Sequence, residues 1–155
     1  MIQRIQSLLL LAVTLISIAL FFVPVSEKAG TELPGMIKTL TIINLQQTAP
    51  DGTISATANY PLVILTCLIG IMAFYIIFRF KNRVQQIKLC MLTGLLAVVN
   101  LILAFYYSEA IEPVNVHAHY LGGTYLIAGQ FVLLLAARRF IAKDEALVRA
   151  ADRIR

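Results

Sequence analysis

Four long apolar stretches, at residues 5–25, 60–78, 89–107 and 120–137, contain no Asp, Glu, Lys or Arg. Each is close to the ~20 residues that an α-helix needs to cross the hydrocarbon core of a bilayer. The chain is 59% hydrophobic and 14% charged, and a soluble domain of 155 residues could not bury four such helices. We therefore expect an all-α membrane protein, a single domain over residues 1–155 with four transmembrane helices.

The positively charged residues predict how these helices are oriented. If residues 1–4 lie in the cytoplasm, every Lys and Arg except Lys28 and Lys38 falls in a cytoplasmic segment. Positively charged loops resist translocation, so this distribution predicts a bacterial inner-membrane protein with both termini in the cytoplasm. Residues 138–155 then form a cytoplasmic helical tail. The first stretch is longer than the ~7–15-residue core of a cleaved signal peptide, so we expect it to be retained.

The longest polar segment, residues 26–59, is expected on the outer side. Along residues 39–45, Thr39, Thr41, Ile43 and Leu45 alternate with Leu40, Ile42 and Asn44. A Pro50-Asp51-Gly52 turn signal follows, and residues 53–58 are small and rich in Thr. This pattern predicts a small extracytoplasmic β-hairpin between the first and second helices. Because an isolated hairpin is marginally stable in water, the alternating residues 114–119 are a candidate third strand.

Few polar residues lie within the apolar stretches. Thr14, Asn100 and Gln130 fall in the middle third of the bilayer, where hydrogen bonds between helices, at about 0.6 kcal/mol each, are the simpler interpretation. A polar path for a small-molecule or lipid-binding carrier is the alternative. The stretches hold no ionisable acid or base, which disfavours a proton-coupled transporter. With no nucleophile–base pair, P-loop or dinucleotide motif, we expect no enzyme, and no nucleic-acid motif is present.

His117 and His119 form an H-x-H at the outer end of the fourth stretch. On a strand, residues two apart face one side, so two imidazoles could share a metal ion. The chain has 2 His in all, so a complete site would need carboxylates as well. Solvated loop histidines are the favoured interpretation, and we expect no cofactor. A metal- or haem-linked redox component is the alternative.

Three segments resemble a known family. They are MIQRIQ at residues 1–6, FKNR at residues 80–83 with Gln86, Leu89 and Cys90, and KDEALVRAADRIR at residues 143–155. On these motifs the whole chain resembles an uncharacterised integral membrane family of the Bacteroidetes, domain of unknown function 4293. The resemblance implies an inner-membrane protein with four spans and no assigned activity, and it carries no catalytic residues.

By the expected topology, all three segments lie at the cytoplasmic face. Interfacial anchoring together with local salt bridges is one interpretation of these residues. A recognition surface is the other, because an anchor alone would need only scattered cations and the charged tail looks ordered. We therefore expect a non-enzymatic accessory or scaffold subunit that docks through this face, with membrane lipids and other membrane protein subunits as partners. The candidate interaction residues are Arg4, Lys81, Arg83, Lys143, Asp144, Glu145, Arg149, Asp152 and Arg153.

Overall fold

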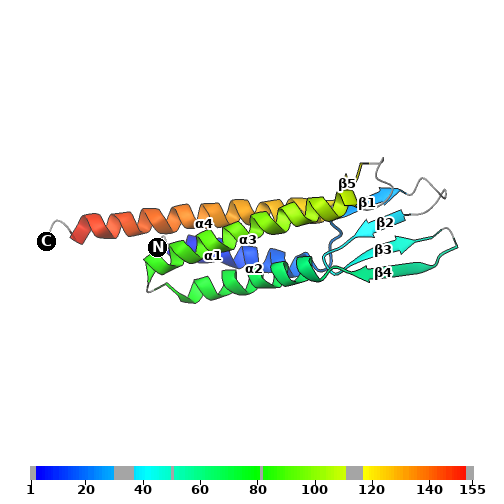
Figure 1. The fold of residues 1–155 in the computed structure, drawn as a ribbon. Helices are drawn as coiled ribbons and strands as arrows, with labels where there is room; N and C mark the ends of the chain where they lie inside the picture. Colours follow the sequence, from blue (N-terminus) through cyan, green and yellow to red (C-terminus); the bar gives the residue numbers. More distant parts are fainter. Residues whose placement is uncertain (1–2, 30–36, 50, 81, 111–116, 153–155) are drawn as a thin grey trace.

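The computed structural model describes residues 3–29, 37–49, 51–80, 82–110 and 117–152; for Gln3, Arg4, Arg149, Ala151 and Asp152 it describes the backbone alone. In this part of the chain, four helices form an elongated bundle and five strands form a sheet at one end of it (Figure 1). We call this the sheet end and the opposite end the distal end. Figure 1 shows that α1 begins and α4 finishes at the distal end.

The helices are α1 (Gln3–Ala19), α2 (Tyr60–Phe78), α3 (Arg83–Ala110) and α4 (Gly122–Asp152). Each packs against two others, in the pairs α1–α2, α2–α3, α3–α4 and α4–α1, so the bundle closes on itself. Pro61 lies in the first turn of α2, where its missing N–H would have no helical partner in any case. The α2–α3 connection is short, which makes these helices antiparallel neighbours.

The interior of the bundle combines buried leucine and isoleucine side chains with small and polar residues, and its outside is covered by large apolar ones. Buried positions include Ala73, Ala97 and Asn100, whereas Ile64 and Leu95 are more than 60% exposed. Soluble bundles show the reverse pattern, because water drives their large apolar side chains inward. Close packing through small residues, with apolar side chains facing outward, is typical of helices surrounded by lipid. The chain therefore has the surface of a membrane protein.

Three helices are long and apolar enough to cross a membrane: Tyr60–Phe78, Arg83–Ala110 and the part of α4 from Gly122 to Val148. The expectation of four transmembrane helices was wrong, because the apolar part of α1, Ile5–Ala19, is too short to count as a fourth span. At ~1.5 Å per residue, the 17 residues of α1 rise about 25 Å, against a hydrocarbon core of ~30 Å.

The apolar stretch at residues 5–25 misled this prediction because it is only partly helical. After Ala19 the chain makes tight turns, with the Phe22 N–H donating to the Ala19 carbonyl at 3.0 Å. Pro24 then forbids a helical hydrogen bond and favours an extended residue before it. The last apolar residue of the stretch, Val25, is fully buried where the chain enters the sheet, and its N–H donates to the Leu40 carbonyl at 2.8 Å.

The sheet is also larger than the predicted hairpin. Its strands are β1 (Ser26–Ala29), β2 (Ile37–Leu40), β3 (Asn44–Thr48), β4 (Ile54–Ala58) and β5 (His119–Tyr120). Their order is β4-β3-β2-β1-β5, and all neighbours are antiparallel. A hairpin is present between β3 and β4. The fold is therefore a helical bundle with a five-stranded sheet, and not an all-α protein with a hairpin.

Two turns explain the difference. Residues 39–45 are divided between β2 and β3 because the Thr41 hydroxyl donates to the Asn44 carbonyl at 2.8 Å and accepts from the Asn44 N–H at 3.0 Å. This local bonding reverses the chain where alternation alone predicted a continuous strand. The β3–β4 turn uses Gly52 at φ +80°, a conformation that side chains disfavour. Of the predicted third strand, residues 114–116 lie outside the described residues, and its end forms β5.

Candidate functional site

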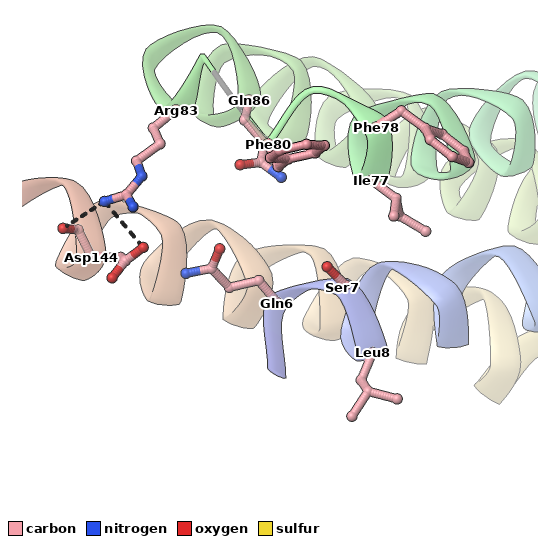
Figure 2. A pocket seen from close by; sticks show the side chains of 9 residues that line it. All are labelled: Gln6, Ser7, Leu8, Ile77, Phe78, Phe80, Arg83, Gln86 and Asp144. Carbon is pink, nitrogen blue, oxygen red and sulfur yellow. Dashed lines mark hydrogen bonds and ion pairs between the residues drawn. The ribbon is translucent and has the colours of Figure 1, made fainter. Parts of the chain in front are cut away.

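A cavity of about 640 Å³ opens at the distal end of the bundle. It lies between the first turns of α1, the α2–α3 connection and α4 (Figure 2). Such a volume is within the range of small-molecule sites, ~300–1,000 Å³. The residues that matter most to its chemistry are Gln6, Leu8, Phe78, Arg83, Gln86 and Asp144.

An ion pair forms one side of this cavity. Arg83 Nη1 lies 3.2 Å from Asp144 Oδ2, and it donates to the Asp144 backbone carbonyl, also at 3.2 Å. Both side chains are mostly buried, with exposed fractions of 22% and 15%. The pair joins the start of α3 to α4. Two of the charged residues that the sequence selected for an interaction surface are thus brought together, and they contact each other.

Gln6 supplies a buried donor to the cavity. The residue is 5% exposed, and its amide nitrogen has no hydrogen-bond partner among the described residues. Figure 2 shows the amide end directed to the side of the cavity where Arg83 and Asp144 lie. Gln86, also buried, instead donates to the Ile76 carbonyl at 3.2 Å. Leaving a buried amide unpaired costs about 1–3 kcal/mol of stability. Gln6 is therefore the residue of this site whose buried donor lacks a hydrogen-bond partner among the described residues.

Two helix N-termini also face this region. Gln6 lies in the first turn of α1, Arg83 begins α3, and neither first turn contains an acidic residue. The unpaired N–H groups at a helix start carry about half a positive charge. One of these groups is satisfied locally, because the Asn82 side chain accepts from the Gln85 N–H at 3.2 Å. The cavity therefore combines backbone positive potential with the balanced charges of Arg83 and Asp144.

The last part of α4 extends beyond the bundle. Ile141 is fully buried, but from Ala146 onward the described side chains are exposed, with Leu147 at 54% and Val148 at 42%. Figure 1 shows α4 continuing past the ends of the other helices. Its 31 residues rise about 46 Å, more than the bilayer core requires. The end of α4 thus presents apolar side chains that no described residue covers.

The other residues of the predicted interaction surface are placed less fully. Lys143 is exposed and Glu145 is half-buried, both on the distal part of α4. Lys81 and Arg153 lie outside the described residues. Of Arg4, Arg149 and Asp152, only the backbone is described.

The family model described as "Domain of unknown function (DUF4293)" matches residues 2–154. The chain belongs to the DUF4293 family. No curated protein matches it. Because the family description names no activity, the role of this DUF4293 protein is inferred from its own geometry.

A polar network at the sheet end of the DUF4293 chain was missed by the sequence analysis, which counted Lys28 as a loop cation. Lys28 is 1% exposed; its ammonium donates to the Glu109 carbonyl at 3.0 Å and lies 3.5 Å from the Glu109 carboxylate. Tyr120 donates to the same carboxylate at 2.8 Å. Burial, and then the Glu109 carboxylate, raises the pKa of Tyr120. The alternation of residues around Lys28 was too short to indicate its buried side.

The polar residues of the middle level bond mainly to neighbouring helices. Asn100 donates to Thr66 on α2 at 3.2 Å, and Gln130 donates to Ser17 on α1 at 2.7 Å. Thr14 bonds within its own helix, one turn back. The carbonyl oxygens of both amides are buried with no partner among the described residues. These contacts hold the helices in register at the centre of the bundle.

The two histidines are on the outer surface of the sheet end. His117 and His119 are exposed, and His119 pairs with Glu27 between β5 and β1. Among the described residues, no three His, Cys, Asp or Glu side chains gather in a way that could hold a metal ion. Cys67 and Cys90 are both free thiols.

Proposed function

We propose that this DUF4293 protein is a non-enzymatic accessory or scaffold subunit of a bacterial inner-membrane assembly. It binds its partner protein through the projecting end of α4, and its distal end faces the cytoplasm. The observation that carries the proposal is the uncovered, helical end of α4, with Leu147 and Val148 exposed.

The charge distribution supports this orientation. Lys28 and Lys38 are the cations of the sheet, and the other described cations lie at or near the distal end. Positive charge near the ends of spans is retained in the cytoplasm, so the sheet is placed outside and the end of α4 inside. The distal cations are Arg79, Arg83, Lys88, Arg138, Arg139 and Lys143.

The position of the exposed apolar residues favours a protein partner over the membrane surface. An interfacial helix lies in the plane of the membrane, whereas α4 continues along the bundle axis (Figure 1). Leu147 is nine residues beyond Arg138, about 13 Å farther along the axis at ~1.5 Å per residue. The headgroup layer is only about 5–8 Å thick on each side. Leu147 and Val148 therefore lie well past the level of Arg138 on a helix that leaves the plane of the membrane, and exposed apolar side chains in such a position mark protein interfaces.

The test is to isolate the tagged full-length protein from its native membrane in mild detergent, and to identify stoichiometric partners by mass spectrometry. A matched variant lacks residues 146–155. This truncation keeps Ile141 and the Arg83–Asp144 pair, so the bundle is expected to remain folded. We expect a partner with the full chain and its loss with the truncated one.

A control variant, Ile54→Ser, replaces an exposed apolar residue of β4 at the sheet end. Ile54 is 69% exposed. The partner should be retained by this variant. Recovery of the full chain without a stoichiometric partner, or an unchanged partner after truncation, would contradict the proposal.

A further inference from the structure

The distal cavity combines an apolar wall, a buried donor and charges of both signs. We propose that it binds a phospholipid whose headgroup carries a phosphate and a primary ammonium, the phosphatidylethanolamine class. This inference rests on the membrane placement proposed above but not on the docking of α4.

The phosphate would be held by groups from α1 and α3. Gln6 offers an amide N–H₂ that is buried, directed into the cavity and unpaired in the described structure. Phosphate oxygens are strong acceptors, and they are favoured at helix N-termini such as those of α1 and α3. Arg83 adds a guanidinium, which has five N–H donors; the contacts to Asp144 described above both use Nη1. An oxygen of a phosphodiester would therefore accept a hydrogen bond from the unpaired Gln6 amide.

The Asp144 carboxylate determines which group the lipid carries beyond its phosphate. This carboxylate balances Arg83, so the charged side chains among the described lining residues sum to zero. A carboxylate has about four lone-pair sites and can accept from an ammonium as well as from Arg83. A purely anionic headgroup would leave Asp144 facing a second negative charge. A choline headgroup has no N–H to donate. A primary ammonium fits both requirements.

The apolar wall indicates a lipid instead of a soluble phosphate compound. Leu8 is 63% exposed and Phe78 is 62% exposed, so part of the apolar lining of the cavity faces outward. Phe78 is the last residue of the candidate span Tyr60–Phe78, so in the proposed orientation this lining lies at the level where the acyl chains begin. A free headgroup would leave these side chains uncovered, whereas a lipid covers them with its own glycerol and acyl carbons.

The experiment is native mass spectrometry of the delipidated full chain, titrated with lipids that share acyl chains and differ in headgroup. Ethanolamine, glycerol and choline phospholipids are compared in the same detergent. We expect the ethanolamine lipid to bind at least about tenfold more tightly, the effect of one charge-assisted hydrogen bond. Soluble phosphoethanolamine should not displace it. Equal binding of the three lipids, or displacement by phosphoethanolamine at equal concentration, would overturn the proposal.

Two variants locate the site. Gln6→Leu should lower affinity for the ethanolamine lipid about tenfold, while Gln85→Leu, an exposed glutamine in the first turn of α3, should leave it unchanged. Asp144→Asn should abolish the preference for ethanolamine over choline. Unchanged binding by Gln6→Leu, or an unchanged preference in Asp144→Asn, would overturn the assignment. Recovery of the full chain without a stoichiometric partner protein, together with intact lipid binding, would contradict the proposed docking alone.

Discussion

The two ends of the bundle treat their polar groups in opposite ways. At the sheet end, the buried ammonium of Lys28 is bonded to Glu109, and the hydroxyls of Ser26 and Ser108 lie 2.7 Å apart. At the distal end, the buried amide nitrogen of Gln6 has no partner among the described residues, and apolar side chains extend past the bundle. The comparison teaches that the polar groups named at the sheet end are bonded within the chain. The distal end instead has a buried donor and exposed apolar side chains to which another molecule can bind.

Removing the Lys28 side chain should have the largest effect on stability. Lys28→Ala deletes a fully buried side chain together with its contacts to Glu109, and truncating a buried side chain of this size costs about 3 kcal/mol. Thermal unfolding in detergent measures this loss of stability, since 1 kcal/mol in the free energy of unfolding shifts the unfolding temperature by about 2–4 °C for a domain of this size. Lys38, paired with Lys28 on the next strand, is the control. Lys38→Ala should cost no more than about 0.5 kcal/mol. Equal effects of the two variants would refute a structural role for the buried lysine.

A second variant tests how closely α4 approaches the sheet. A Cβ at Gly123 would lie 2.6 Å from the Pro24 carbonyl oxygen, a backbone atom that cannot move alone. Gly123→Ala should therefore cost about 2 kcal/mol, as overpacking of a core does.

Gly122→Ala is the matched control, because its Cβ would meet Val23 at an ordinary 3.5 Å. It should change stability by less than about 0.5 kcal/mol. If both alanines are tolerated equally, the contact between α4 and the Pro24 segment is looser than described here.

The sequence predicted helices better than it predicted either end. Residues 60–78 are apolar throughout and form α2, since a long span leaves few alternatives to a helix. The same reasoning failed after α1, where Leu20 and Val25 are apolar because they belong to a buried cluster that residues of the sheet and of the other helices share. The hydropathy of a segment reflects its burial, and residues buried between the sheet and the bundle give the same apolar signal as residues of a helix in lipid.

The site was predicted in part, for a related reason. Arg83 and Asp144 were selected as charged residues near a membrane surface, but their pairing depends on how α3 and α4 pack. Gln6 appeared only as part of the family-like opening motif. Its burial depends on how α1 packs in the bundle, which no local sequence pattern indicates. Lys28 likewise became visible as a buried cation only once β1 was placed between β2 and β5.

At the distal end, deleting a buried polar group should raise the stability of the protein, whereas deleting Lys28 at the sheet end should lower it. In lipid-free detergent, Gln6→Leu replaces an unpaired buried amide with an apolar side chain of similar size. It should stabilise the bundle by about 1 kcal/mol, because the desolvation penalty of the amide disappears. The measurement is again the unfolding temperature, beside Gln85→Leu as the exposed control. A clear loss of stability would show that Gln6 is already satisfied by the chain, and the contrast between the two ends would no longer hold.

The smallest effect on the fold is expected at the end of α4. Leu147→Ser with Val148→Ser changes exposed side chains beyond Ile141, the last residue of α4 whose side chain is described as buried. The unfolding temperature should therefore shift by an amount equivalent to less than about 0.5 kcal/mol. Partner recovery should nevertheless fall as it does on truncation, because buried apolar anchors supply most of the binding energy of an interface. A lipid-anchoring role would give another result, since serine at these positions would then weaken membrane retention and leave protein partners unaffected. A stable variant that keeps its partner would show that the end of α4 is not the binding surface.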